Sequence, residues 1–357
     1  MKILNENRFL NMAYFIEIIE GRLNGSSEQV ETNRKTGFDN VSYVKKISGG
    51  RGIVSAPCQK FNIKRFMESN GLEISKKIKN GKKISISALP HKYVDEDIFG
   101  FMRADKDELT EEQYEKLDEL EKKTLKKDGK KWVRNITKKR KSRFMMSPLV
   151  CTDYGKINLE WNIASTTGDS MPYCVETYSG IFEGISNLDI NNISNFTVSN
   201  NEAEFRDYSD AEVNNKIVNE KELKISNKIK LDRIETCLRG LQYLSIQGNQ
   251  NNHLTDTTPK FIILAEYSWG NNVFQGIIKK GGVDIQALAE SLEDNDRFRI
   301  SDIWIGVSRR IDNEKYKTLK EKLENEFNGM EYIHLGTVKQ AFDGYLEYLK
   351  YSLDFEK

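Results

Sequence analysis

One stretch, residues 48–66 (SGGRGIVSAPCQKFNIKRF), constrains the fold most, because a turn, an apolar pair and a helix start follow one another within it. The double glycine and Arg51 form the turn, and Ile53 and Val54 supply the apolar pair. Ser55 is a good N-cap, because its hydroxyl can accept a backbone N–H that a helix leaves unpaired at its start. Pro57 falls in the first turn, where its missing N–H costs little. The stretch therefore predicts a helix that begins at Ser55.

The predicted helix carries a row of cations. Helical spacing places Lys60 and Lys64 on one face with Arg65 beside them, and leaves Phe61 available to the core. Backbone amides at a helix N-terminus, together with a row of cations, favour the binding of a phosphate chain. A solvated amphipathic helix explains the same pattern, so both interpretations stay open for this segment taken alone.

Composition bounds the protein class. The 357 residues are 31% charged and 38% hydrophobic, with a mean hydropathy of −0.63, and they suffice for one large domain or two. There is no apolar run of about 18 residues and no signal-peptide pattern, so no membrane span is expected. The cysteines (Cys58, Cys151, Cys174 and Cys237) lack CxxC spacing, which argues against a zinc site and against a disulfide framework. We expect a reduced, cytoplasmic protein without a cofactor.

Charge is distributed unevenly along a nearly neutral chain. The net charge is +1, yet residues 104–121 hold nine acids and two bases, whereas residues 122–143 hold twelve bases and one acid, Asp128. The reversal separates an acidic arm from a basic arm. A concentrated basic segment in a neutral chain favours local contact with nucleic acid over general adhesion to polyanions.

The periodicity of apolar residues indicates an α+β protein. Residues 10–20 are expected to form a buried strand, with a helix as the alternative, and residues 157–180 a β-hairpin around a turn-rich centre. Residues 231–244 give the clearest helix, because their apolar side chains form a single stripe. The other expected elements are a return to the core at 97–102, a projecting helix or hairpin at 105–127, a strand or loop at 130–143, a polar surface insertion at 191–227, strands at 261–267, 273–278 and 302–307, and helices at 314–327 and 338–351.

Five stretches occur in the order in which they occur in one protein family. They are residues 21–25 (GRLNG), 48–66, 97–102 (DIFGFM), 145–155 (MMSPLVCTDYG) and 233–267, which joins the helix RIETCLRGLQYL to the polar loop and strand that follow it. In these motifs the chain resembles the CRISPR-associated RAMP proteins that form the backbone of type I Cascade complexes, and among them the type I-B, DevR-like branch. The resemblance covers most of about the first 270 residues and is loose over the rest.

The resemblance implies a fold. Members of this family have a ferredoxin-like (RRM-like) palm, which is an α+β fold, with a long helical fingers insertion and a β-hairpin thumb. The implied division is the first part of the palm at 1–67, a charged fingers-like insertion at 68–144, a palm strand plus the thumb at 145–190 (the thumb at about 157–180), the polar surface insertion at 191–227, and the second part of the palm with C-terminal helices at 228–357.

Candidate RNA-binding residues come from two sources. In the loop at 245–259, glycine lets the backbone approach a phosphate and amide side chains can donate to phosphate, sugar or base, although a flexible surface loop is the alternative. The resemblance implies that this loop follows the guide RNA, that a methionine near residue 145 packs against bases, and that the thumb tip wedges between bases. The expected RNA-binding residues are Arg51, Ser55, Gln59, Lys60, Lys64, Arg65, Met145, Met146, Gly248, Asn249 and Asn251, and the expected thumb residues are Thr166, Thr167, Met171 and Tyr173.

The expected function is a non-catalytic, guide-RNA (crRNA) binding subunit of a type I CRISPR effector that polymerises head-to-tail along the spacer. Its implied partners are the guide RNA, target DNA through the guide, further copies of itself and other Cascade subunits, without a membrane, a metal or a cofactor. The histidines are scattered without HxH or HExxH spacing, and no nucleotide-binding or hydrolase motif is present. Two alternatives stay open: a metal-dependent endoribonuclease of the type III kind with Asp39 in the cleaving role, and a free-standing regulatory RNA-binding protein.

Overall fold

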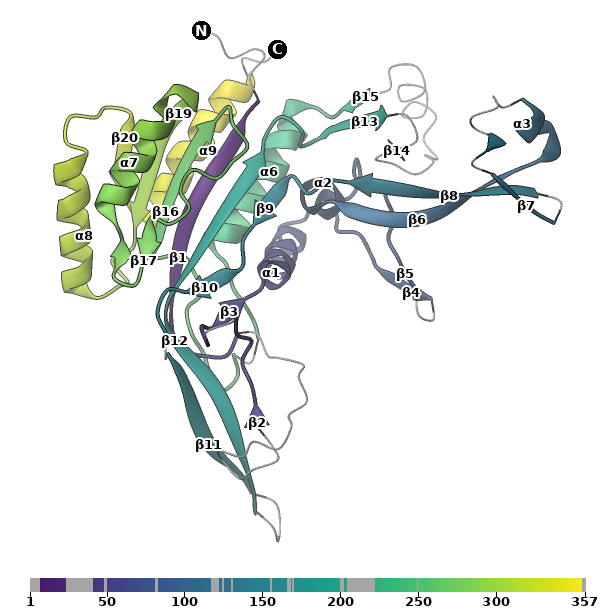
Figure 1. The fold of residues 1–357 in the computed structure, drawn as a ribbon. Helices are drawn as coiled ribbons and strands as arrows, with labels where there is room; N and C mark the ends of the chain where they lie inside the picture. Colours follow the sequence, from purple (N-terminus) through teal and green to yellow (C-terminus); the bar gives the residue numbers. More distant parts are fainter. Residues whose placement is uncertain are drawn as a thin grey trace. The chain divides into compact units, whose positions relative to one another are not determined.

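The computed structural model describes residues 7–23, 41–47, 50–80, 83–116, 122–123, 125–129, 131–154, 156–165, 168, 170–199, 202–203, 222–248 and 250–354. The chain divides into two compact units, whose elements are labelled in Figure 1. Unit 1 comprises residues 1–70, 144–191 and 231–357, and unit 2 comprises residues 71–143 and 192–230. The two segments that the sequence treats as separate insertions therefore supply one compact unit between them.

Unit 1 is built on a large mixed sheet. Its main path runs in the order β20-β19-β16-β1-β12-β10-β3, and β2, β9 and β11 pair with β12 outside this path. Neighbouring strands are antiparallel, except that β19–β20 and β2–β12 are parallel. The strands are β1 (Phe9–Gly21), β2 (Val41–Ser42), β3 (Ile53–Val54), β9 (Phe144–Met146), β10 (Leu149–Cys151), β11 (Ile157–Ser165), β12 (Ser170–Asp189), β16 (Phe261–Tyr267), β19 (Arg299–Val307) and β20 (Ile333–Gly336).

The central strand β1 is buried on both of its faces. Residues 10–16 are all buried, and β1 pairs with β12 on one side and β16 on the other, so that Tyr14 lies between Gly184 and Ile262. A strand can bury both faces only when other elements cover each side of the sheet. The strand interpretation of residues 10–20 is therefore confirmed over the helical one.

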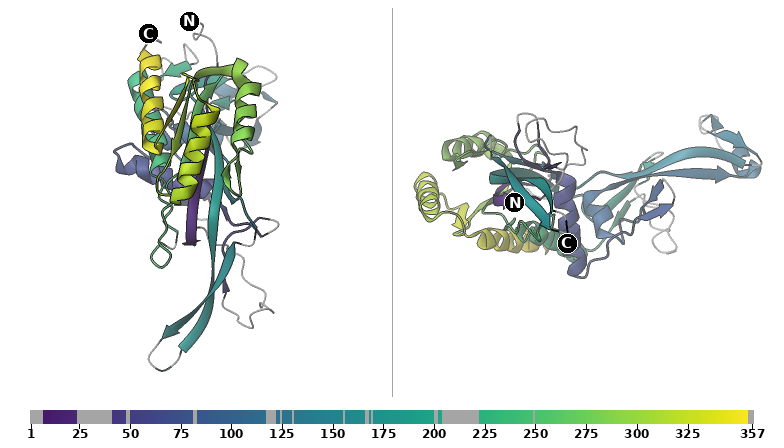
Figure 2. Two further views of the ribbon diagram at one scale, coloured as in Figure 1. Left: turned by 90° about the vertical axis from the view of Figure 1, so that its left-hand side faces the viewer. Right: turned by 90° about the horizontal axis from the view of Figure 1, so that it is seen from below.

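Helices cover both faces of this sheet (Figure 2). On one face, Phe15, Phe261 and Ile303 belong to an apolar cluster that includes residues of α7 (Ile285–Asn295) and α8 (Asn313–Glu326). On the other face lie α1 (Ala56–Ser69), α6 (Asn227–Gln242) and α9 (Val338–Asp354). Because neighbouring residues of a strand point to opposite faces, Tyr14 points toward α1 while Phe15 points toward α7 and α8.

A buried ion pair ties the start of the chain to its end. The guanidinium of Arg8 donates to both carboxylate oxygens of Glu266, at 2.8 and 3.0 Å, and to the hydroxyl of Ser352 in α9 at 2.9 Å. Tyr345, also in α9, donates to Glu266 at 2.9 Å. Arg8 and Glu266 are at most 1% exposed. This network therefore fixes α9 against β16.

The hairpin predicted at residues 157–180 is present. β11 pairs with the outer half of β12 from Ile157↔Tyr178 to Ser165↔Ser170, and β12 then continues without a break into the sheet. Other expectations need correction. Residues 273–276 form a turn, so the strand predicted at 273–278 is reduced to β17 (Ile278–Lys279), which pairs with β18 (Gly282–Val283), and the sequence did not predict α7.

Unit 2 contains the acidic and basic arms, paired with each other. β6 (Phe101–Leu109), β8 (Lys131–Arg140) and β7 (Lys126–Asp128) form a sheet in the order β6-β8-β7, and α3 (Glu111–Glu115) follows β6. The hairpin observed joins residues 101–109 to residues 132–140, so the bounds 105–127 predicted for a helix or hairpin are wrong. The ion pairs Lys131–Glu108 (2.6 Å) and Lys127–Glu111 (3.2 Å) join the arms, so part of the basic segment is neutralised within the unit.

A second buried ion pair holds unit 2 together. Arg140 pairs with Asp97 at the end of α2 (Val94–Phe99), and both side chains are fully buried. Arg140 also donates to the carbonyl oxygens of Asn192 at 2.6 Å and Asn195 at 3.1 Å. The DIFGFM motif therefore returns the chain to a core, but to the core of unit 2. The other strands of the unit are β4 (Ile78–Asn80), β5 (Lys83–Ser85), β13 (Asn195–Ser199), β14 (Glu202–Ala203) and β15 (Glu222–Lys224).

No helix in the described part of the chain is long and apolar enough to cross a membrane.

We predict that Glu266→Gln destabilises the protein strongly. The substitution leaves the Arg8 guanidinium buried without its counter-charge, and breaking a buried pair in this way costs about 3–5 kcal/mol. The measurement is the urea concentration at the midpoint of unfolding, with Glu293→Gln on the exposed face of α7 as the control. Equal midpoints for the two variants would contradict a structural role for the pair.

Candidate nucleic-acid interface

Helix α1 begins where the sequence predicts, but its buried face differs from the expected one. Ser55 occupies the N-cap with extended backbone (φ −65°, ψ 149°), although its side chain makes no capping hydrogen bond, and Pro57 lies in the first turn. Gln59, Ile63 and Met67 are buried. These positions recur every four residues and form one face.

The structure removes one residue from the candidate set and corrects another. Gln59 is fully buried: it accepts a hydrogen bond from Tyr14 Oη at 2.7 Å and donates to the carbonyl of Ser147 at 3.0 Å. Its predicted RNA contact is therefore wrong, because its amide is used inside the core. Phe61, expected in the core, is 59% exposed because it lies on the face opposite Gln59 and Ile63.

The predicted cations share the outer side of α1. Lys60 and Lys64 are half-buried and Arg65 is exposed. Burial lowers the pKa of Lys60, the nearby Cys237 raises it, and the positive charge of Lys64 lowers it further. Lys60 and Lys64 are four residues apart on one helix and so lie on the same face, and an anion placed near both would relieve their repulsion.

The loop that follows α6 packs against α1. Arg65 donates to the side chain of Gln247, and the rings of Phe66 and Tyr243 stack with centroids 6.0 Å apart. A Cβ on Gly240 would lie 2.9 Å from the side chain of Ile63, so only glycine allows the two helices to approach this closely. The structure therefore brings Arg65 of α1 into contact with the loop at 245–259.

Hydrogen bonds hold this loop in a defined conformation. Thr257 Oγ1 donates to the carbonyl of Leu244 at 2.8 Å and accepts from Ile246 N at 3.0 Å, and Gln250 bonds to Ile246 O and Thr255 N, both at 2.8 Å. Of the candidate RNA-binding residues in this loop, Gly248 lies against the backbone of Leu23, and Asn251 is exposed. Asn249 lies outside the described residues. A cavity of about 450 Å³ opens beside the loop, lined by Tyr243, Leu244, Ser245, Gln247, Gln250, Asn251, Leu254, Thr255, Asp256, Thr257 and Thr258.

Asp256 anchors the end of the loop to the sheet. Its carboxylate pairs with Lys260, which is buried, and with Arg310 at 3.0 Å. Burial raises the pKa of Asp256, but the hydrogen bonds from Lys260 and Thr258 outweigh this effect and lower the pKa to about 2. The carboxylate is therefore charged at neutral pH and forms ion pairs with both Lys260 and Arg310.

The remaining candidates lie elsewhere in unit 1. Arg51 lies over the ring of Tyr154, 5.2 Å from its centroid, and its Nη1 is 3.5 Å from the carbonyl oxygen of Cys151. Met145 and Met146 are half-buried in β9, paired with β12. The structure thus places Arg51 at the end of β10, where its contacts are with β10 and the turn that follows it.

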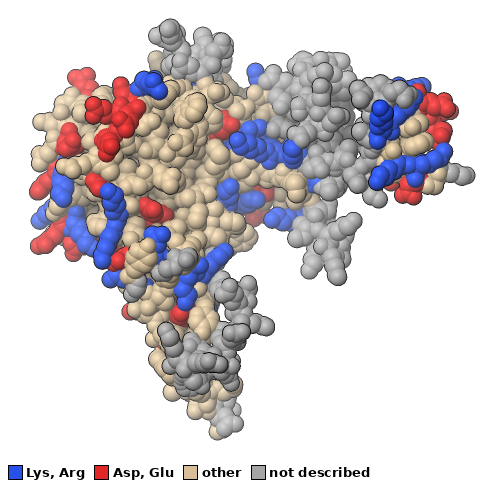
Figure 3. Space-filling view, in the orientation of Figure 1, with Lys and Arg blue, Asp and Glu red and all other residues tan. Residues whose placement is uncertain are grey.

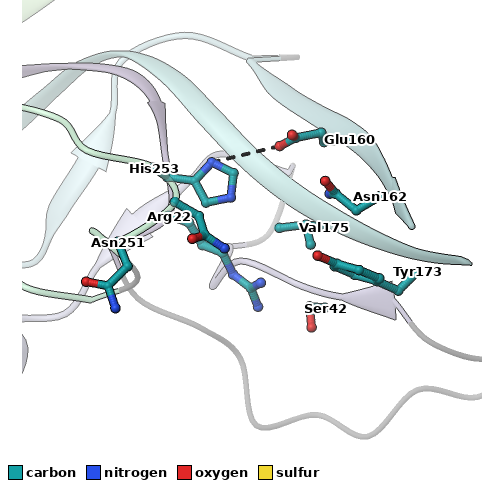
Figure 4. A pocket seen from close by; sticks show the side chains of 9 residues that line it. Arg22, Ser42, Glu160, Asn162, Tyr173, Val175, Asn251 and His253 are labelled. Atoms are coloured by element: carbon teal, nitrogen blue, oxygen red, sulfur yellow. Dashed lines mark ion pairs between the residues drawn. The ribbon is translucent and has the colours of Figure 1, made fainter. Parts of the chain in front are cut away.

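A second cavity, of about 580 Å³, lies between the hairpin and the loop at 245–259 (Figure 4). We call it the hairpin pocket. The side chain of Arg22 extends into it, and His253 Nδ1 lies 3.8 Å from Glu160 Oε2 at its rim. The hairpin pocket is lined by Arg22, Ser42, Glu160, Asn162, Tyr173, Val175, Asn251, Asn252 and His253.

Of these residues, only Tyr173 and Asn251 are predicted from the sequence as candidates. Arg22 stood inside the GRLNG motif, but its neighbours in space come from three distant segments of the chain, so no local pattern marks it. His253 has no metal-ligand spacing in the sequence, and the partner it faces in the structure, Glu160, is far away in the chain.

The opposite side of the hairpin carries apolar side chains. Leu159, Trp161 and Ile163 alternate with the pocket residues Glu160 and Asn162 along β11, so they point away from the pocket. Their exposed fractions are 38%, 56% and 68%. Met171 is exposed near the tip as well. Thr166 and Thr167 at the tip lie outside the described residues.

No candidate metal centre stands out among the described residues. Within the described ranges, no group of three or more His, Cys, Asp or Glu residues could hold a metal ion, and Asp39 lies outside those ranges. Figure 3 shows basic and acidic side chains interspersed on the side of the view that carries α7 and α8. Local arrangements of charge, rather than the net charge, therefore decide where an anion can bind.

No protein-family model and no curated protein matches the sequence. Among solved structures, the chain is similar to one in a "CRISPR RNA-guided surveillance complex", with 11% identity and a TM-score of 0.46 over 86% of this chain and 92% of that chain. It is also similar to one in a "CRISPR RNA-guided surveillance complex, pre-nicking", with 9% identity and a TM-score of 0.47 over 98% of this chain and 100% of that chain.

We predict that Gly248→Ala destabilises the loop. A Cβ at this position would lie 2.2 Å from the carbonyl oxygen of Leu23, so the loop must move away from the end of β1. The expected result is a lower melting temperature together with faster amide hydrogen exchange in residues 245–257. Gly281→Ala is the control, because a Cβ there meets nothing within 4 Å. Equal melting temperatures and exchange rates would show that the contact does not hold the loop.

Proposed function

We propose that this protein is a non-catalytic, guide-RNA binding backbone subunit of a type I CRISPR effector, as the resemblance of its motifs implies. One observation carries the proposal. Arg65 of the cationic helix α1 and the amide-rich loop at 245–259, which are far apart in the sequence, are joined in unit 1 by the Arg65–Gln247 hydrogen bond beside the Phe66–Tyr243 stack. Cations beside amide donors are the groups that contact a phosphate backbone.

The chemistry of this surface favours binding without sequence preference. Lys60, Lys64 and Arg65 are charged donors that neutralise phosphates, whatever base each phosphate carries. The exposed Phe61 on α1 and Tyr243 beside the loop can stack on any base, since every base has a π-face. A subunit that serves arbitrary spacers needs this property, because base pairing by the guide then supplies the specificity for target DNA.

We further propose that unit 1 is a ferredoxin-like palm. Its strand order β16-β1-β12-β10 is antiparallel throughout, α1 lies in the chain between β1 and β10, and α6 lies between β12 and β16, which supports this assignment. Unit 2 then corresponds to the fingers, and the β11–β12 hairpin to the thumb. The strands β19 and β20 extend the palm sheet beyond β16.

The proposed assembly is a head-to-tail filament on the guide, in the cytoplasm, with other effector subunits at its ends. The apolar side chains of Leu159, Trp161 and Ile163 support this part of the proposal, because a contiguous apolar stripe on a hairpin is costly to leave in water. A second copy can cover the stripe. When one surface of a copy binds a different surface of the next copy, the contact can repeat along a chain of copies. The result is an open filament if the rotation between neighbouring copies does not close a ring.

The binding surface is tested with the double variant Lys60→Ala/Lys64→Ala. Fluorescence anisotropy with a labelled single-stranded RNA should show weaker binding, and the slope of log affinity against log salt should fall by about 0.7 for each lost phosphate contact. Lys317→Ala/Lys320→Ala on the exposed side of α8 is the matched control and should retain both values. Wild-type affinity and slope in the folded α1 variant would refute the assignment, and magnesium-dependent cleavage of the RNA would favour the endoribonuclease alternative.

Assembly is tested with Leu159→Ser/Ile163→Ser. We expect this variant to bind a short RNA normally and to form fewer multi-copy complexes on a long one, because the apolar stripe no longer gains by burial. Sedimentation velocity on a long single-stranded RNA measures the difference. Met330→Ser/Leu335→Ser removes two other exposed apolar side chains, 39% and 38% exposed, from another surface and should assemble as wild type does. Uniform long complexes from the hairpin variant would exclude this stripe as the contact between copies.

A further inference from the structure

We propose that the hairpin pocket is a phosphate-binding site in which Arg22 supplies the positive charge. This site is separate from the lysines of α1, although Asn251 of the loop at 245–259 lines both the hairpin pocket and the cavity beside the loop. Its clearest sign is the Nε atom of Arg22, which is buried and finds no hydrogen-bond partner within the described part of the chain. A buried donor of a charged group is costly to leave unpaired, so its geometry indicates a missing acceptor.

The backbone on both sides of Arg22 is fixed. Leu23 N donates to Tyr178 Oη at 3.1 Å, and Leu23 O lies against Gly248. On the other side, Glu20 N donates to Ser179 Oγ at 2.8 Å, and Gly21 packs against Thr255. The guanidinium is therefore carried on a held segment and points into the cavity from a defined position, which lowers the entropic cost of binding.

The carboxylates near Arg22 are engaged by other groups. Glu176 accepts from Lys46 Nζ at 2.6 Å and from Val44 N at 3.2 Å. Glu160 faces His253 across 3.8 Å. Burial lowers the pKa of Arg22, while Glu176 and Tyr178 raise it, and an arginine remains charged at neutral pH in either case. Among the described residues, Arg22 thus has no carboxylate in direct contact.

Most of the other groups that line the cavity can donate to an anion; the exceptions are the carboxylate of Glu160 and the apolar Val175. The donors are the hydroxyl and amide side chains of Ser42, Asn162, Tyr173, Asn251 and Asn252. A guanidinium and a phosphate match in geometry, since two parallel N–H groups can bond two phosphate oxygens. The positive charge of Arg22 would repel a metal cation, and an apolar ligand would leave the Nε atom without a hydrogen-bond acceptor. A phosphate is therefore the ligand class that fits this lining.

The size of the cavity indicates that the phosphate belongs to a larger molecule. At about 580 Å³ the hairpin pocket falls in the range of roughly 300–1,000 Å³ that is typical of small-molecule sites. On the proposed function, the ligand is a phosphodiester of the bound RNA at the root of the hairpin. A free phosphorylated molecule has the same chemistry, and the experiment must separate the two sources.

The experiment compares Arg22→Gln with Arg309→Gln, an exposed arginine on the turn before α8, in the full-length protein. With labelled single-stranded RNA, Arg22→Gln should reduce the salt slope by about 0.7 and the affinity by about tenfold or more, whereas Arg309→Gln should change neither. In a second arm, calorimetric titration with inorganic phosphate and with adenosine monophosphate reports binding that does not require RNA. Heat of binding in wild type that is lost in Arg22→Gln supports a free phosphorylated ligand.

The outcomes distinguish this inference from the proposed function. If only Arg22→Gln binds RNA more weakly, the hairpin pocket is supported and the α1 surface is excluded. If only Lys60→Ala/Lys64→Ala binds RNA more weakly, the α1 surface is supported and the hairpin pocket is excluded as an RNA contact. If Arg22→Gln does not fold, Asn162→Ala removes a donor from the pocket and should also weaken binding, with its melting temperature unchanged. The inference is overturned when the folded Arg22 or Asn162 variant retains wild-type RNA affinity and salt slope and wild-type response to both phosphate probes.

Discussion

The burial of β1 on both faces is the constraint on which unit 1 depends. A strand without a solvent face requires a layer of helices on each side, and its alternating side chains assign a partner to each layer. Tyr14 reaches α1 through Gln59, while Phe15 joins the cluster of α7 and α8. At its two ends, the same strand positions Arg8 against Glu266 and Arg22 in the hairpin pocket. The cations of both proposed sites are thus placed by one strand.

Several of the basic residues that could bind RNA already form ion pairs with carboxylates of the same protein. The basic arm of unit 2 looks like the strongest polyanion site in the sequence, yet the acidic arm pairs with it strand to strand, and Lys127 and Lys131 already have carboxylate partners. Lys260 and Arg310 likewise share Asp256. By contrast, the buried Nε atom of Arg22 has no hydrogen-bond partner among the described residues. Local pairing therefore changes which basic residues are relevant to RNA.

Local patterns predict the helices and the hairpin well, because capping, turn chemistry and apolar periodicity operate within a few residues. They fail where the deciding contact is distant. Gln59 looks like a surface residue of a basic helix, but its amide is satisfied by Tyr14 and Ser147, which are 45 and 88 residues away. Phe61 is displaced to the surface by the same rotation of the helix. Arg22 could not be selected from sequence, since its pocket is assembled from segments that only the sheet brings together.

The composition of unit 2 has a consequence for how such proteins can diversify. Its core is shared by two stretches of chain, because Arg140 in the first bonds to Asp97 in the same stretch and to the carbonyl oxygens of Asn192 and Asn195 in the second. Recombination that imports a new version of residues 71–143 alone would deprive those carbonyls of their donor. The two stretches must therefore be inherited as a pair, although more than forty residues of the sheet unit separate them in the gene.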